Sequence, residues 1–137
     1  MKIEYRPAGN GAYAVLADES VTDLAARISS FQVGMSKSPF NINGYGALAT
    51  LPVDMGNAGW RLGFIVERLH ASADAALEYL AAHPAAFSSL GNLDLKITVG
   101  AKVTYMLNSV ATEFAPNPHS DLSTICRYTF TGGSYTN

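Results

Sequence analysis

The strongest constraint on the fold is a strict alternation of apolar and polar residues in two segments of the second half of the chain. Leu93, Leu95, Ile97 and Val99 alternate with polar residues, and in residues 60–67 the heavier apolar side chains occupy the even positions. Because successive side chains of a β-strand point to opposite faces of the sheet, this period of two predicts two strands, each with one buried face. We expect residues 60–67 to lie near the centre of a sheet.

The C-terminal part of the chain predicts a long hairpin. Residues 103–114 and 122–131 are rich in Thr, Tyr, Val, Ile and Phe, which favour strands. They flank residues 116–121, where two prolines, an asparagine and an aspartate favour a turn. Two glycines and a serine then end the last predicted strand, so residues 134–137 are expected to form a flexible tail.

Two segments have the spacing of short amphipathic helices. In residues 21–31 the apolar side chains recur at intervals of three and four, after a hydroxyl and a carboxylate at the spacing of a capping box. Residues 73–83 follow Ser72, a good N-cap, and precede Pro84, which is expected to stop the helix. Both helices are predicted to pack on the sheet.

The N-terminal half predicts a hairpin followed by a long loop. Residues 2–6 and 13–15 alternate around a reversal that contains Pro and Gly. Residues 38–58 carry one charge, many Gly and Asn, and several apolar side chains, with a short edge strand within 47–53. Such a charge-poor loop serves either as a subunit interface or as cover for the core. Its candidate interface residues are Phe40, Ile42, Tyr45, Leu48 and Met55.

These elements together predict an α+β fold with a mainly antiparallel sheet of about five to six strands and two short helices packed on it. Short connections cannot join parallel neighbours, which is why the sheet is expected to be antiparallel. The chain has 137 residues and shows no repeat or linker, so residues 1–137 are expected to form a single domain. Only 15% of the residues are charged, which favours a surface used in protein contacts.

No residue pattern indicates a catalytic, cofactor-binding or metal site. Cys126 lies on a predicted strand face among apolar residues, which favours a buried and inert thiol over a nucleophile. His70, His83 and His119 lack a second ligand at the spacing of common zinc motifs. The two Gly-x-Gly segments lack the further glycine of a nucleotide-binding fingerprint. We therefore expect no cofactor, and spacing alone singles out no pair of carboxylates for hydrolysis.

The charge pattern also limits the partners. The nine Lys and Arg are spread along a chain with a net charge of -2, whereas nucleic-acid binders usually carry a basic stripe. Wholly apolar runs, such as residues 64–66, fall far short of the roughly 18 residues of a membrane span. Residues 1–6 alternate charges and lack the apolar stretch of a secretory signal. We expect no nucleic-acid or membrane partner and a cytoplasmic location.

Four segments resemble small tail-associated structural proteins of bacteriophages and prophages: GWRLGF at 59–64, AALEYL at 75–80, LDLKI at 93–97 and RYTFTGG at 127–133. The resemblance covers residues 59–133. It implies a compact, β-rich, non-enzymatic subunit that forms a homo-oligomer or ring, contacts other assembly proteins and is located in the virion. It also implies contacts through residues 38–58 and the terminal hairpin.

Two other functions remain open from the sequence. A small-molecule-binding or enzymatic α+β domain of unknown substrate would show a concave pocket with convergent polar groups and a strongly shifted pKa. A cleft lined by Cys126, a histidine and a carboxylate would favour it. A peptide-binding module would instead show an unpaired strand with a groove beside it.

Overall fold

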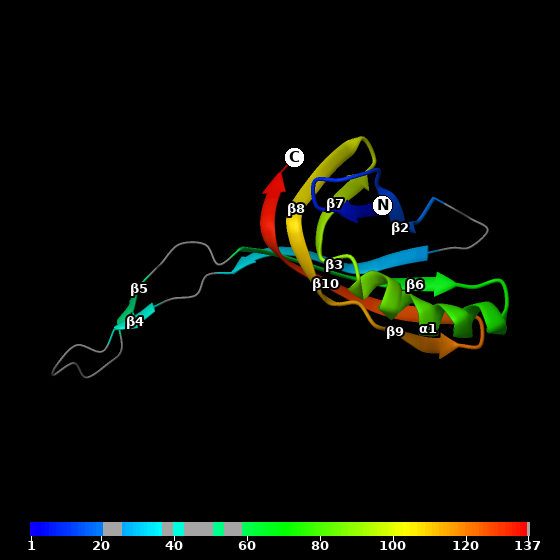
Figure 1. The fold of residues 1–137 in the computed structure, drawn as a ribbon. Helices are drawn as coiled ribbons and strands as arrows, with labels where there is room; N and C mark the ends of the chain where they lie inside the picture. The colour runs from blue at the N-terminus through cyan, green and yellow to red at the C-terminus, as the bar shows by residue number, and fades with distance from the viewer. Residues whose placement is uncertain (21–25, 37–39, 43–50, 54–58, 137) are drawn as a thin grey trace.

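The computed structural model describes residues 1–20, 26–36, 40–42, 51–53 and 59–136. Within these ranges the chain forms ten strands and one helix (Figure 1). Eight strands form the main sheet: β1 (Lys2–Pro7), β2 (Ala14–Asp18), β3 (Ala26–Ser36), β6 (Gly59–Leu69), β7 (Asn92–Val99), β8 (Lys102–Glu113), β9 (Pro116–Ser120) and β10 (Ser123–Thr136). The other elements are β4 (Phe40–Ile42) and β5 (Leu51–Val53), which pair with each other, and the helix α1 (Ala73–Ser88).

The main sheet is antiparallel throughout its described pairings. Its order is β2-β1-β7-β8-β10-β6-β3, and β9 pairs with the first part of β10. In Figure 1, β1, β2 and β7 arch over β3, β6 and β10, and α1 runs along β9 and β10. The predicted mainly antiparallel sheet is confirmed, but the described strands exceed the expected five to six, because β3, β4 and β9 lie in segments predicted as helix, loop and turn.

The core of the sheet lies between β6 and β10, which are neighbours. Tyr128 lies opposite Phe64, and Phe130 opposite Leu62, in the register of the two strands. All four side chains are at most 1% exposed. Burying an aromatic or aliphatic side chain of this size contributes about 1.5–3 kcal/mol relative to leaving it exposed. The period of two read from residues 60–67 therefore predicts the right strand, and β6 lies inside the sheet between β10 and β3.

The predicted helix over residues 21–31 is wrong where the structure describes it, because Ala26–Ser36 is strand β3. Residues 21–25 lie outside the described residues. The register with β6 shifts between Ser29 and Gln32, so this strand has a bulge. Ile28 and Phe31 consequently both pack against the core although they are three positions apart. A bulged strand thus reproduced the interval of three that is typical of a helix.

Helix α1 begins where predicted and ends later. Ser72 is its N-cap, and the Ser72 hydroxyl accepts a hydrogen bond from the Ala75 amide at 3.1 Å. Pro84 lies inside the helix, which continues to Ser88. The last turn carries Phe87, which is 3% exposed and contacts the ring of Phe130. Burial of this ring offsets the cost of about 3 kcal/mol that an internal proline imposes on a helix.

Strand β10 is longer than predicted and has two partners on the same edge. Its first residues pair with β9, and its last residues, up to Thr136, pair with β8. The terminal hairpin of β8 and β10 is confirmed, but residues 134–136 belong to the strand, in contrast to the flexible tail expected for 134–137. The chain passes Gly133, with a positive φ of 66°, without leaving the sheet.

A buried carboxylate connects β7 to its two neighbours. Asp94 is 4% exposed. Its Oδ2 accepts hydrogen bonds from Nε of Arg6 at 3.1 Å and from the Gly9 amide at 2.9 Å. Its Oδ1 accepts one from the Asn108 amide at 2.9 Å. The charge can be buried between Leu93 and Leu95 because each carboxylate oxygen has its donors.

Candidate functional site

The outer face of the main sheet, which is the face opposite the core, contains a hollow of about 460 Å³. Its centre is Gly63 on β6, which lies between Gln32 of β3 and Thr129 of β10. A Cβ atom at Gly63 would have one heavy atom within 4 Å, the carbonyl oxygen of Tyr128 at 3.8 Å. The absent side chain and the bulge of β3 together leave this space open.

Two arginines stand at opposite ends of this hollow, which we call the arginine hollow. Arg61 is two residues before Gly63 on β6, and Arg127 lies opposite Ile65, two residues after it. Both arginines are exposed and line the hollow. Neither has a hydrogen bond or an ion pair within the described ranges. Unpaired guanidinium groups at the two ends make the hollow suited to carboxylate or phosphate groups.

A second polar cluster lies on the other side of the sheet, under α1. The hydroxyl of Tyr128 lies 2.7 Å from Nε2 of His83 and 3.4 Å from the hydroxyl of Tyr79. Desolvation, and after it the positive charge of Arg68, lowers the pKa of His83. Nε2 of the neutral imidazole can accept a hydrogen bond from the Tyr128 hydroxyl. Burial raises the pKa of Tyr128 far above its usual range, so this hydroxyl stays protonated.

This cluster satisfies polar groups that the helix buries against the sheet. The rings of Tyr79 and His83 stack at a centroid distance of 4.7 Å, and the Arg68 guanidinium lies 5.4 Å from the Tyr79 ring centre. His70 extends the cluster, with Nε2 at 2.9 Å from the Thr124 hydroxyl. Burial also lowers the pKa of His70, with a smaller contribution from the Arg68 charge. The histidine and tyrosine side chains each have a partner, whereas Nε of Arg68 is buried without a hydrogen-bond partner among the described residues. The partnered groups fit a role in packing the helix.

Cys126 is buried, as the sequence predicts. It is 2% exposed, and burial raises the pKa of its thiol to about 11. A nucleophilic thiol needs a lowered pKa and an approach for the substrate, and Cys126 has neither. Cys126 lines neither the arginine hollow nor the small groove beside the start of α1.

The third histidine lies in the outer rim of the sheet. Nε2 of His119 on β9 lies 3.6 Å from Oε1 of Glu67 on β6. Among the described residues, no group of three or more His, Cys, Asp or Glu could hold a metal ion. In the same part of the chain, no helix reaches the length and hydropathy required to cross a bilayer.

The predicted interface residues fall partly outside the described ranges. Phe40 and Ile42 lie at the two ends of β4, opposite Val53 and Leu51 of β5. The described parts of the predicted loop therefore form a small two-stranded sheet, and Figure 1 shows it set apart from the main sheet. Tyr45, Leu48 and Met55 lie outside the described residues, so the interface formed by this set stays a prediction.

The search of solved structures finds a likeness in fold. A chain in a solved structure of the phage p2 baseplate, in its activated conformation with Sr, superposes on this chain with a TM-score of 0.56. The fold is similar to that of a phage baseplate chain. The likeness covers 94% of this chain and 43% of the baseplate chain, at 11% sequence identity. No family model and no curated protein matches the sequence.

The baseplate likeness concerns the fold, and this chain spans less than half the length of the baseplate chain. It agrees with the phage resemblance read from residues 59–133 and extends over most of the chain. The sequence did not single out the arginine hollow. Alternation places Arg61 and Gly63 on one face of a strand, but Arg127 and Gln32 join them only through the register of three strands, which the sequence leaves open.

Proposed function

We propose that the chain is a structural subunit of a phage or prophage tail, which assembles with copies of itself and with other tail proteins and carries out no catalysis. The observation that carries this proposal is the fold shared with a phage baseplate chain over 94% of this chain. The proposed location is the virion. Cys126, the most reactive side chain by chemical type, has a raised pKa and is buried, which favours a role in packing.

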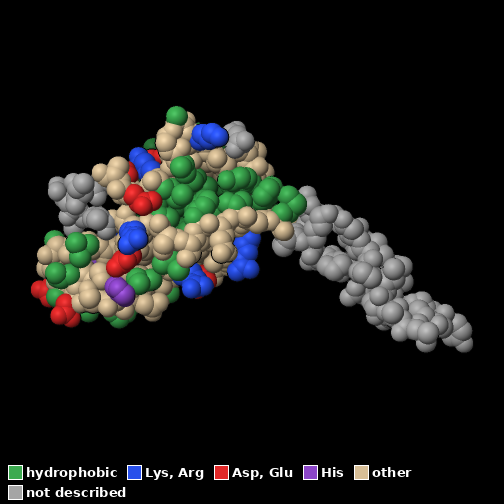
Figure 2. Space-filling model, turned by 180° about the vertical axis from the view of Figure 1, so that it is seen from behind, with side chains coloured by type: hydrophobic (Ala, Val, Ile, Leu, Met, Phe, Trp, Pro, Cys, Tyr) green, Lys and Arg blue, Asp and Glu red, His purple; other side chains and the backbone are tan. Residues whose placement is uncertain are grey.

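The surface supports a role in assembly. Figure 2 shows hydrophobic side chains gathered over the middle of one face of the molecule. Seven large hydrophobic side chains of the described residues are at least 43% exposed: Val15, Met35, Leu69, Leu77, Val99, Val110 and Leu122. These seven come from different elements, and it is the gathered apolar patch in Figure 2 that is typical of protein contacts. Only 15% of the residues are charged, and this low share also favours a surface used in protein contacts.

The proposed contacts include the hairpin of β4 and β5. Phe40 and Ile42 lie on this hairpin, and the hairpin lies away from the main sheet in Figure 1. A hairpin in this position can reach a neighbouring subunit. We extend the proposal to the remaining candidates, Tyr45, Leu48 and Met55.

A second candidate function is supported by the arginine hollow. Its volume of about 460 Å³ lies in the range of small-molecule sites. Arg61 and Arg127 would select an anionic ligand. In this alternative the chain is a binding or enzymatic domain, and a screen of anionic metabolites by thermal shift tests it. A rise in the melting temperature that is lost in Arg61→Ala and Arg127→Ala would favour this function.

The state of association tests the structural proposal. Light scattering after size exclusion should show a mass that rises with concentration in the micromolar range, and negative-stain images should show discrete rings or stacks. A molecule that stays monomeric throughout this range, and that binds none of the tail proteins encoded beside it, would contradict the proposal. Variants of Phe40 and Ile42 to Ser should weaken association without changing the far-UV circular dichroism of the sheet.

A further inference from the structure

The arginine hollow is a concave surface with a single sign of charge. Its lining contains two arginines and no acidic side chain. Two carboxylates lie beside the hollow: Glu67, two residues after Ile65 on β6, and Glu113 on β8. Oε1 of Glu67 lies 3.6 Å from Nε2 of His119, and Oε2 of Glu113 accepts a hydrogen bond from the Thr129 hydroxyl at 3.3 Å. Within the described residues, Glu113 forms no ion pair with either arginine. No ion pair within the described part of the chain therefore neutralises the two positive charges, and a concave polar surface strengthens their attraction for an anion.

Acidic side chains without ion pairs gather at another place, which we call the acidic end. It consists of Asp74 and Glu78 on α1 and Asp121 in the turn between β9 and β10. All three are exposed, and none forms a salt bridge among the described residues. The turn and the helix adjoin, because Asp121 lines the same small groove as Ala73. Asp74 and Glu78 are four residues apart on the helix, where like charges repel.

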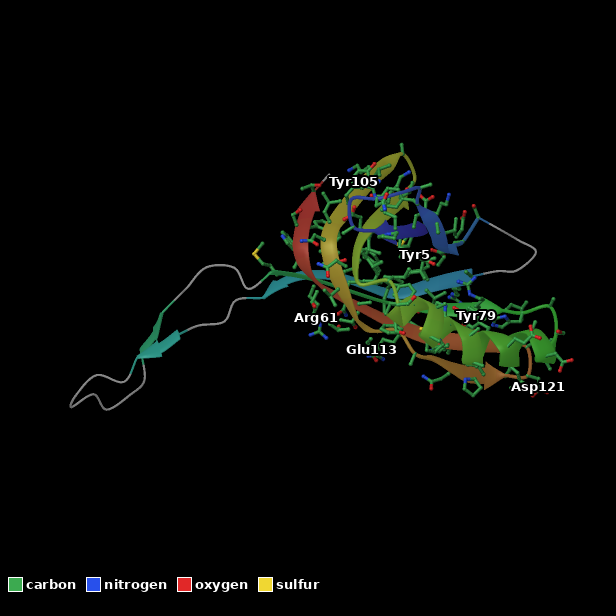
Figure 3. The ribbon with its side chains drawn as sticks, in the orientation of Figure 1. Tyr5, Arg61, Tyr79, Tyr105, Glu113 and Asp121 are labelled. Carbon is green, nitrogen blue, oxygen red and sulfur yellow. The ribbon has the colours of Figure 1, made fainter. Side chains whose placement is uncertain are left out.

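The two surfaces lie apart on the molecule. Figure 3 shows Asp121 at the tip beyond α1, well along the sheet from Arg61. Figure 2 shows acidic side chains at the end of the molecule away from the grey trace, and basic side chains along the adjoining face. One subunit cannot bring its own acidic end into its own hollow, but two subunits arranged head to tail can bring these surfaces together.

We propose that the arginine hollow binds the acidic end of a second copy of this chain. The hollow has a volume of about 460 Å³, and the turn at Asp121 carries the exposed apolar side chain of Leu122 beside the carboxylate. The guanidinium groups of Arg61 and Arg127 receive carboxylates of the acidic end in bidentate hydrogen bonds. The inference rests on the proposed function, since it names the contact through which the subunits assemble.

The contact is heterologous, because the two surfaces differ. Repeating a heterologous contact gives a closed ring if the rotation closes and an open filament if it does not. The charged groups of this contact stay accessible to solvent. The affinity should therefore fall as salt is added, because the Debye length shortens from about 10 Å at 0.1 M to about 3 Å at 1 M salt. A purely apolar interface would not weaken in this way.

Two charge-reversed variants test the contact. Arg61→Glu/Arg127→Glu makes the hollow acidic, and Glu78→Arg/Asp121→Arg makes the acidic end basic. Each variant alone should remain monomeric at concentrations where the unchanged chain associates. An equal mixture of the two should associate again, because each acidic hollow then meets a basic end and each basic hollow meets an acidic end. Light scattering measures the masses, and far-UV circular dichroism confirms that both variants fold.

The control is Arg27→Glu/Lys102→Glu, which changes the net charge as much as the first variant at exposed positions outside the hollow. It should associate like the unchanged chain. If both reversed variants still associate on their own, or if the mixture stays monomeric, the inference is wrong while the proposed function stands. If the unchanged chain never associates with itself, the self-assembly part of the proposed function and the inference both fail.

Discussion

The hydroxyl of Tyr128 lies 2.7 Å from Nε2 of His83, and it joins a buried residue of β10 to helix α1. Burial lowers the pKa of His83 below its usual value of 6.5, and the Arg68 charge lowers it further. His83 therefore binds a proton less tightly in the folded protein than in the unfolded chain. The free energy of unfolding should be constant above about pH 7 and should fall as the pH drops from 6.5 toward 5.

Urea unfolding at several pH values in this range checks the expectation. His70 contributes in the same direction, since its pKa is lowered too. In the double variant His70→Gln/His83→Gln, the free energy of unfolding should therefore vary less with pH than in the unchanged chain. An unchanged slope in the double variant would mean that other groups cause the acid sensitivity.

Truncation of Phe87 should detach α1 from the sheet. The ring of Phe87 is almost fully buried and contacts five other rings, those of Tyr5, His83, Phe114, Tyr128 and Phe130. Phe87→Ala should lower the free energy of unfolding by about 3–5 kcal/mol, the usual range for removal of a buried aromatic ring. The matched control is Leu77→Ala on the same helix, where 65% of the residue is exposed and the loss should stay below about 0.5 kcal/mol.

Cys126 should react slowly with a thiol reagent in the native protein. Its pKa of about 11 keeps the thiol protonated near neutral pH, and burial blocks the reagent. The labelling rate should rise steeply in urea, as unfolding exposes the side chain. The control is Cys126→Ser/Ser134→Cys, which moves the thiol to an exposed position on β10 and should react promptly. Prompt reaction of the native Cys126 would restore it as a candidate nucleophile.

The segments with a clear period of two were predictable, and the irregular ones were not. Leu93, Leu95 and Ile97 are buried on β7, because a regular strand with one face toward the core shows this alternation directly. Strand β3 has its bulge between Ser29 and Gln32, which mixes intervals of two and three. Local spacing cannot distinguish that mixture from a helix, since the bulge is fixed by pairing with β6.

Features of the site that depend on local sequence were predictable, and those that depend on strand register were not. Burial of Cys126 was predictable from its apolar neighbours on one strand face. The arginine hollow depends on Gly63 standing between β3 and β10, and thus on a register that residues distant in sequence set together. Helix α1 passes Pro84 because Phe87 finds a buried position, which is a tertiary effect that overrides the local preference.

Removal of the Asp94 charge should destabilise the fold. Burial favours a raised pKa, but hydrogen bonds from the amides of Gly9 and Asn108 and from Arg6 outweigh it and hold the pKa of Asp94 below its usual value. Asp94→Asn keeps the shape but replaces one acceptor oxygen with an NH₂ group, so the free energy of unfolding should fall by about 2–4 kcal/mol. Its stabilising contribution is lost only as the pH falls through that lowered pKa, below the range in which the histidines titrate.

Denaturant unfolding of Asp94→Asn at neutral pH measures this loss. Glu78→Gln is the control, because it also removes one negative charge but at an exposed position of α1, and it should change stability by less than about 0.5 kcal/mol. Equal stability of the two variants would mean that the buried carboxylate is replaceable by an amide.

Gly133 should tolerate no side chain. Its φ is 66°, and a Cβ atom at this position would lie 1.6 Å from the carbonyl oxygen of Leu107 on β8. The clash is with backbone, so β8 and β10 would have to separate where they pair. Gly133→Ala should cost more than about 3 kcal/mol. Gly9→Ala is the matched control: φ is 71° there, no atom lies within 4 Å, and only the left-handed strain of about 1 kcal/mol applies. Thermal and urea unfolding of both variants measure the difference, and a loss at Gly133 no larger than that at Gly9 would show that the end of β10 is not held against β8.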